Sequence, residues 1–211
     1  MIISVQNQKG GVGKTSIAIH VSHALCLLGY KVLLIDADPQ GSARDWAASR
    51  RSEPLFSVMG IDRPSIHKEV PLLAPNYDHI LIDGAPRVTE LARSAIAAAD
   101  LVLIPVQPSP YDVWATAEVI NLIKEASVFK ESLKSVFVVN RKIANTAIGR
   151  DVNEALASYQ IPVLKSQITQ RVSFAESAGT GQTVMETEPN GQASQEIKAV
   201  VKELMELQNH G

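Results

Sequence analysis

The chain has 211 residues, 45% of them hydrophobic and 20% charged, and a formal net charge of −2. These values are ordinary for a globular domain and exclude a global electrostatic attraction to nucleic acid or to an anionic membrane. Any DNA binding must therefore come from a local basic patch or from the combined patches of two subunits. The single cysteine, Cys26, excludes an internal disulfide and fits a reducing compartment. The uncharged run at residues 15–30 is short for a membrane span, and its two histidines make it polar for one.

Apolar runs and helical patterns alternate along the chain. Short apolar runs predict strands at residues 2–5, 31–35, 55–58, 80–82, 101–106, 136–140 and 163–168. Helical spacing predicts a first helix from Lys14 that Gly29 stops, and further helices at 42–50, 89–99, 113–127, 149–158, 172–178 and 195–207. Four prolines interrupt residues 52–78, where the pattern is least readable: Pro54, Pro64, Pro71 and Pro75.

This alternation predicts the fold class. Strands that alternate with helices favour an α/β architecture, a mainly parallel twisted sheet with helices on both faces. No repeat, low-complexity segment or linker divides the chain, so we expect a single domain over residues 1–211.

A glycine-rich segment between the first strand and the first helix carries the chemistry. It reads Gln-Lys-Gly-Gly-Val-Gly-Lys-Thr from Gln8 to Thr15, which predicts a P-loop nucleoside triphosphatase. Glycines let backbone N–H groups converge on an anion, and the helix N-terminus adds its positive end. Lys14 would reach the β- and γ-phosphates, and the Thr15 hydroxyl would ligate Mg²⁺. The expected nucleotide-binding residues are Gly10, Gly11, Val12, Gly13, Lys14, Thr15 and Ser16.

Three aspartates follow predicted strands and are candidates for the metal. Asp83 comes directly after Ile-Leu-Ile, where a carboxylate can hold the waters of a bound Mg²⁺. Asp36 and Asp38 lie two residues apart, so their carboxylates point the same way if the strand continues through them. An Asx turn before Pro39 is the alternative for this pair, and a helix cap is the alternative for Asp83.

These motifs resemble one known family. Lys-Gly-Gly-Val-Gly-Lys-Thr at residues 9–15 is similar to the deviant Walker A signature of the ParA/MinD ATPases, and Gln8 stands where the usual loop has glycine. The resemblance continues through Asp-Ala-Asp-Pro-Gln at 36–40, Ile-Leu-Ile-Asp-Gly-Ala-Pro at 80–86 and Ile-Pro-Val-Gln-Pro-Ser-Pro at 104–110. It covers most of the chain and looks closest to short ParA proteins that partition plasmids and lack an N-terminal DNA-reading domain.

The resemblance implies roles for particular residues. Lys9 would cross a dimer interface and touch the partner's nucleotide, as an arginine finger does, so Lys9, Lys14 and Asp38 are the expected catalytic residues. Asp38 would position the attacking water, while Asp36, Thr15 and Asp83 would serve the metal. Adenine would meet Asn140 and Arg141, and also the segment at 169–171, where Gln170 replaces a proline common in the family.

The function that the resemblance implies is an ATP-driven partition switch. An ATP-bound homodimer would bind DNA non-specifically in the cytoplasm, on the nucleoid. A ParB-type centromere-binding partner would stimulate hydrolysis to ADP and release the dimer. The candidate DNA contacts are Arg141, Lys142, Arg150, Arg171, Lys198 and Lys202, for which a solvated loop and surface ion pairs are the alternatives.

Other functions remain open at this point. A protein compartment is another cargo for such a switch. A MinD-like membrane-positioning ATPase would need a basic amphipathic helix, whereas the last predicted helix carries Glu203 and Glu206, so we expect no membrane partner. A nitrogenase-type reductase needs cluster-binding cysteines that a single Cys26 cannot supply, and an amide-forming ligase needs a substrate pocket.

Overall fold

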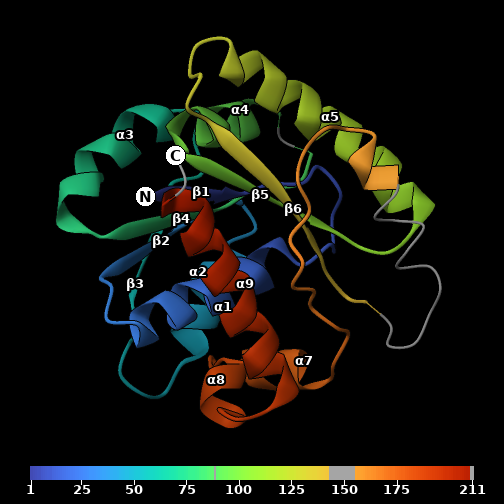
Figure 1. Ribbon diagram of the computed structural model, residues 1–211. Coiled ribbons are helices and arrows are strands. Elements are labelled where there is room, and N and C mark those ends of the chain that lie inside the picture. Colours follow the sequence, from blue (N-terminus) through green and yellow to red (C-terminus); the bar gives the residue numbers. More distant parts are fainter. Residues whose placement is uncertain (88, 143–154, 210–211) are drawn as a thin grey trace.

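The computed structural model describes residues 1–87, 89–142 and 155–209. Six parallel strands form one sheet in the order β3-β2-β4-β1-β5-β6, with helices on both faces (Figure 1). This confirms the predicted α/β fold of the P-loop type. The strands are β1 (Ile2–Val5), β2 (Val32–Asp36), β3 (Ser57–Gly60), β4 (His79–Asp83), β5 (Leu101–Val106) and β6 (Lys134–Val139).

The helices form two layers around the sheet (Figure 1). One face is covered by α1 (Lys14–Leu27), α2 (Ser42–Ser49), α7 (Ser173–Ala178), α8 (Val184–Thr187) and α9 (Gln192–Asn209). The other face is covered by α3 (Ile66–Leu73), α4 (Thr89–Ala98) and α5 (Pro110–Ser127), and a 3₁₀ turn, η1 (Ala74–Asn76), leads from α3 to β4.

The apolar strands explain this arrangement. Side chains alternate between the two faces of a strand, so a strand that is apolar at every position needs cover on both sides. In β2, Leu34 packs in the core beside α1 and α9, whereas Leu33 and Ile35 pack in the core beside α3 and α4. The central strands are therefore buried throughout, and all their carboxyl ends lie at one edge of the sheet.

The strand register brings two predicted site residues together at that edge. Strand β4 lies between β1 and β2, and Asp83 is the register partner of both Val5 and Asp36. The glycine-rich segment follows Val5 directly. The two aspartates and the phosphate loop therefore converge at the carboxyl ends of three adjacent strands, where open α/β sheets carry their ligands.

Two expected strands differ from the structure: the one at 55–58 is displaced to β3 at Ser57–Gly60, and the one at 163–168 is absent. The expected strand at 163–168 is wrong, since this segment makes only isolated bridges, one between Phe137 and Val163 and one between Lys142 and Thr169. Leu164 and Ile168 still donate their backbone N–H groups to β6. Between them, Glu203 of α9 accepts the backbone N–H groups of Lys165 and Ser166, so a side chain interrupts the pairing with β6.

Helix α3 lies in the segment 52–78, for which the sequence pattern predicted no helix. Pro71 is inside this helix, and a proline there removes one backbone hydrogen bond. Ile66 and Val70, one turn apart, are both buried against α4, so tertiary packing stabilises a helix that the local sequence disfavours. Of the helix predicted at 149–158, residues 149–154 lie outside the described residues, and residues 155–157 are helical.

Helix α9 packs on the core as predicted. Its apolar positions Ile197, Val200, Val201 and Leu204 are all buried in the cluster that α1 shares. The apolar face of this helix is therefore buried in the protein interior. Among the described residues, no helix is long and apolar enough to cross a membrane.

A buried histidine behind the phosphate loop makes stability depend on pH. Burial lowers the pKa of His20 to about 4, although the hydrogen bond of its Nδ1 to the Ser16 carbonyl at 2.7 Å raises it. Its Nε2 accepts the Val184 N–H. An unfolded histidine titrates near 6.5, so the unfolded chain binds more protons below that pH and the native state loses stability as pH falls. We expect His20 alone to lower the free energy of unfolding by about 2 kcal/mol between pH 7 and pH 5.

Urea denaturation at several pH values measures this dependence. His20→Gln keeps an acceptor for Val184 but cannot titrate, so its stability should fall less steeply with pH. His79, whose pKa burial also lowers to about 4, should make a separate contribution that His79→Gln removes. Identical slopes in His20→Gln and the unchanged protein would contradict the assignment.

Candidate functional site

The glycine-rich segment forms a tight loop between β1 and α1. Gly11 and Gly13 adopt φ angles of 76° and 94°, in the left-handed region that favours glycine. A Cβ atom on Gly13 would collide with the side-chain amide of Asn140. Glycine is therefore required at position 13 for two reasons, backbone conformation and close packing.

Side chains from neighbouring strand ends hold this loop. The Asn140 amide, after β6, donates to the Val12 carbonyl at 2.7 Å, and Gln107, after β5, donates to the Gly11 carbonyl at 2.9 Å. Asn7 in turn donates to the Pro105 carbonyl at 2.8 Å. The sequence predicted an adenine contact for Asn140 but no role for Asn7 or Gln107. Their position, directly after apolar strands that end at the same edge, is the signal that could have found them.

The lysine predicted to bind phosphate, Lys14, lies at the junction of the loop and α1. Lys14 is buried at the start of α1, and its ammonium donates to the Lys9 carbonyl at 3.1 Å. Burial lowers the pKa of Lys14, while the negative charges of Asp83 and Asp38 raise it. The loop thus concentrates a cation and converging backbone N–H groups at one point, as an anion site requires.

Asp83 has the environment expected of a metal-serving carboxylate. It is fully buried, and within the described chain neither of its oxygens has a hydrogen-bond partner. Burial raises its pKa to about 7, with the nearby Thr15 side chain lowering it and the charge of Asp36 raising it. A buried carboxylate beside Thr15 fits a Mg²⁺ ion with coordinated waters, because those waters would donate hydrogen bonds to both Asp83 oxygens.

Asp36 and Asp38 differ from Asp83, because other parts of the chain already use their oxygens. Asp36 accepts the backbone N–H of Asp38 at 3.1 Å and that of Arg44 at 2.9 Å, which anchors the start of α2. Asp38 accepts the Gln40 N–H at 3.0 Å, so the Asx turn before Pro39 is present. Strand β2 ends at Asp36, so strand geometry does not continue through Asp38. Asp83 is therefore the carboxylate best suited to the metal.

Lys9 makes a contact that the sequence did not predict. Its ammonium lies 2.9 Å from the Asp112 carboxylate in the first turn of α5, within the same subunit. Its backbone N–H donates to Asn7 Oδ1 at 2.9 Å, so the residue is held at both ends. Two exposed aromatic rings flank Asp112 along the helix, Tyr111 and Trp114, which pack edge to face at 5.5 Å between centroids.

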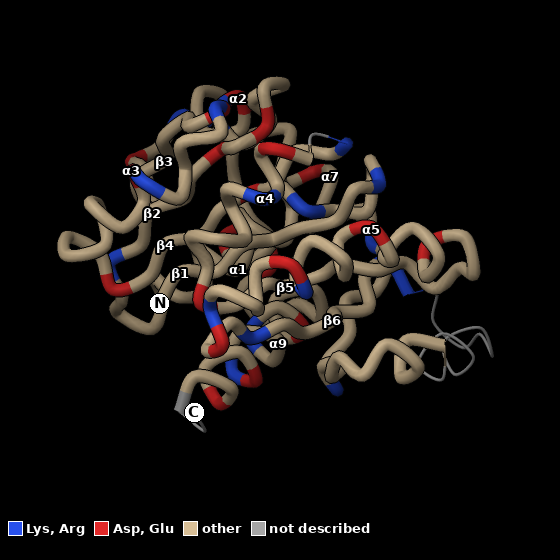
Figure 2. The backbone as a smooth tube through the Cα atoms, turned by 90° about the horizontal axis from the view of Figure 1, so that it is seen from above, with Lys and Arg blue, Asp and Glu red and all other residues tan. Residues whose placement is uncertain are grey.

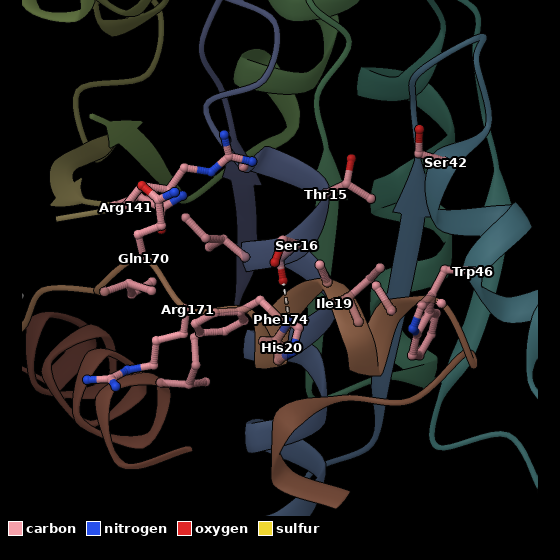
Figure 3. A pocket seen from close by; sticks show the side chains of 18 of the residues that line it. Thr15, Ser16, Ile19, His20, Ser42, Trp46, Arg141, Gln170, Arg171 and Phe174 are labelled. Atoms are coloured by element: carbon pink, nitrogen blue, oxygen red, sulfur yellow. Dashed lines mark hydrogen bonds between the residues drawn. The ribbon is translucent and has the colours of Figure 1, made fainter. Parts of the chain in front are cut away.

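A cavity of about 1180 Å³ opens beside the first turn of α1. Figure 3 shows Thr15 and Ser16 at its centre, with Arg141 and Gln170 on one side and Trp46 on the other. The residues that the resemblance implied for adenine all line this cavity, namely Asn140, Arg141, Thr169, Gln170 and Arg171. The structure therefore brings the predicted adenine residues to the phosphate loop, and their contacts stay predictions.

The candidate DNA residues do not form one patch. Arg141 and Arg171 line the cavity, and Arg171 pairs with Glu196 at 3.2 Å. Lys198 donates to the Pro189 carbonyl at 3.1 Å, and Lys202 is exposed one turn further along α9. Figure 2 shows acidic and basic residues interspersed along this helix. Lys142 follows β6, and Arg150 lies outside the described residues.

Comparison with known proteins agrees with this geometry. Residues 3–184 match the model of the CobQ/CobB/MinD/ParA nucleotide binding domain. The chain belongs to this family. The ParA/MinD resemblance read from the phosphate loop is thereby confirmed, and the residues of the site described above stay candidates for binding the nucleotide.

Several relatives match nearly the whole chain. "Maintenance of carboxysome distribution protein A" of Halothiobacillus neapolitanus is 30% identical over 207 residues, which are 96% of this chain and 95% of that protein. "Chromosome-partitioning ATPase Soj" of Thermus thermophilus is 28% identical over 235 residues, covering 96% of this chain and 94% of Soj. Among solved structures, the MinD protein of Pyrococcus horikoshii in complex with Mg-ADP shares the fold, with a TM-score of 0.75 at 20% identity and coverage of 98% and 96%.

Asp83→Asn tests the metal assignment. Without the charge that holds the metal's waters, the gain in ADP affinity that Mg²⁺ provides should fall by about 10- to 100-fold, while ADP binding in EDTA stays the same. The nucleotide-free variant should be no less stable than the unchanged protein, because the substitution removes a buried unpaired charge. Calorimetric titration with and without Mg²⁺ measures the first effect, and thermal unfolding the second.

Asp45→Asn is the matched control, since Asp45 lines the same cavity from α2 but is exposed. Equal Mg²⁺ dependence in the two variants would rule out the role of Asp83.

Proposed function

We propose that this protein is a Mg²⁺-dependent ATPase that positions an intracellular cargo by switching between a monomer and an ATP-bound dimer. The observation that carries the proposal is the phosphate loop with two lysines beside a buried carboxylate, Asp83, whose oxygens accept no hydrogen bond within the part of the chain that the structure describes. Lys14 and the loop N–H groups would bind the phosphates, while Thr15 and Asp83 would serve the metal. Asp38 would position the attacking water, because the turn to Gln40 engages only one of its oxygens among the described residues.

Lys9 and its surroundings support an ATP-bound homodimer. The Lys9 side chain is 38% exposed at the mouth of the phosphate loop, within reach of a second subunit. Tyr111 and Trp114 are 73% and 65% exposed on the adjoining turn of α5, and exposed aromatic pairs of this kind are enriched at protein interfaces. A cation from the partner at the phosphates would offset charge that develops during phosphoryl transfer.

The relatives suggest the kind of cargo. A protein named for carboxysome distribution matches this chain at 30% identity over nearly its full length, which favours a protein compartment as cargo. The Soj relative supports DNA partition as the second candidate, with a ParB-type partner that stimulates hydrolysis. Both cargoes use the same switch and differ in the partner.

Non-specific DNA would be the surface on which the dimer moves. The exposed Lys198 and Lys202 and the half-buried Lys142 support this part of the proposal, although acidic neighbours interrupt the α9 lysines. Two subunits would double the number of cations on one face, and binding would weaken steeply with salt. A membrane surface is disfavoured, since the apolar face of α9 is buried in the core.

Analytical ultracentrifugation tests the switch and the surface together. With ADP the protein should sediment as a monomer, and with a non-hydrolysable ATP analogue and Mg²⁺ as a dimer that co-sediments with DNA of any sequence. Binding of that dimer to liposomes instead of DNA would favour the membrane alternative. A monomer under saturating analogue and Mg²⁺ would overturn the proposal and leave a nucleotide-binding protein only.

Lys9→Gln tests the role of the second lysine. The variant should fold and bind ADP normally but lose ATP hydrolysis stimulated by DNA and partner, by about 10³-fold if Lys9 acts as an arginine finger does. Phosphate release measures turnover, and circular dichroism measures folding. Lys68→Gln, at an exposed lysine of α3, is the matched control and should behave as the unchanged protein. Full stimulated turnover in Lys9→Gln would remove Lys9 from the mechanism.

A further inference from the structure

The ion pair between Lys9 and Asp112 is unequal in its surroundings. The Asp112 side chain is only 4% exposed, whereas the Lys9 side chain is 38% exposed. Asp112 Oδ2 lies 2.9 Å from the Lys9 ammonium, and its buried Oδ1 has no hydrogen-bond partner in the described part of the chain. The negative charge of Asp112 is therefore balanced by Lys9. Lys9 is exposed enough to be solvated by water or to bind another anion.

Helix α5 does not need the contact between Lys9 and Asp112 in order to form its first turn. Its backbone N–H bonds to the Ser109 carbonyl, and no side chain caps the first turn of α5. The Asp112 carboxylate instead accepts a hydrogen bond from the Lys9 ammonium. If Lys9 leaves, a buried carboxylate stays behind without a partner, which is unfavourable.

A second contact links Lys9 to the nucleotide. Its carbonyl accepts the hydrogen bond from the Lys14 ammonium, the group expected to bind the phosphates. A bound triphosphate would compete with that carbonyl for the N–H groups of the Lys14 ammonium. Nucleotide binding would thus remove one of the contacts that hold Lys9, while the Asp112 contact remains.

We propose that Asp112 is a positioning residue that holds Lys9 on its own subunit and so sets the threshold for dimerisation. The inference rests on the proposed function, in which Lys9 acts on the partner's nucleotide. A lone subunit keeps Lys9 on Asp112. Only a partner that carries a triphosphate offers an anion strong enough to replace that carboxylate. The pair therefore suppresses dimerisation and hydrolysis in the absence of the correct nucleotide.

Asp112→Asn tests the inference, because the amide retains the shape but not the charge that holds Lys9. The protein concentration for half-maximal dimer with an ATP analogue and Mg²⁺ should fall by about tenfold, since each dimer releases two ion pairs worth a few-fold each. Hydrolysis of ATP without any stimulating partner should rise by a similar factor while the KM for ATP stays within about twofold. Asp112→Glu retains the charge and should restore the higher threshold.

Two further variants separate this role from a structural one. Asp112→Asn combined with Lys9→Gln should behave as Lys9→Gln alone, because Asp112 acts through Lys9. Glu125→Gln, which removes an acid paired with Arg93 elsewhere on α5, is the matched control and should leave dimerisation unchanged. Thermal unfolding of each variant confirms that the fold is intact.

The outcomes distinguish the inference from the proposed function. If the unchanged protein does not dimerise with the analogue, the proposed function itself fails. If it does dimerise, but Asp112→Asn dimerises equally or less readily, the inference is wrong. It is also wrong if Asp112→Asn promotes dimerisation in the Lys9→Gln background.

Discussion

The phosphate loop keeps its shape because side chains from other strand ends hold its carbonyl groups. Asn140 bonds to Val12 and Gln107 bonds to Gly11, so the ends of β6 and β5 fix a loop that begins at the end of β1. With those carbonyls engaged elsewhere, the loop N–H groups remain available for an anion. The nucleotide site therefore depends on the parallel register of the sheet, which brings these strand ends to one edge.

The same register brings together charged side chains that the described residues do not fully balance. Asp83 and Asp36 are register partners on adjacent strands, both buried, with Lys14 close by. Backbone donors compensate Asp36, whereas Asp83 has none among the described residues. A Mg²⁺ ion with its waters would relieve this imbalance, so metal and nucleotide binding would stabilise the fold as well as supply the chemistry.

In the proposed mechanism, Lys14 binds the nucleotide of its own subunit and Lys9 acts on the nucleotide of the partner. Lys14 lies inside its own pocket, and its ammonium contacts the backbone of Lys9. Lys9 lies at the mouth, bonded to Asp112 and beside the exposed Tyr111 and Trp114. Phosphate binding by Lys14 would thus alter a contact of Lys9, and Lys9 lies beside the surface where a second copy would bind.

The sequence by itself determined the local elements and the identity of the site. The apolar runs at 2–5 and 101–106 predicted β1 and β5, and the spacing of Gly10, Gly11 and Gly13 before Lys14 predicted the phosphate loop, because these features depend on residues close in the chain. Only the tertiary structure decided which residues support that loop. Gln107 and Asp112 meet it across about one hundred residues of chain, and Asn7 ties its start to Pro105. Pro71 is tolerated because other residues of α3 pack against α4, and residues 163–168 are no strand because Glu203 binds the N–H groups of Lys165 and Ser166. Each of these depends on which strand ends and helix faces become neighbours, and that is fixed by the packing of the whole sheet.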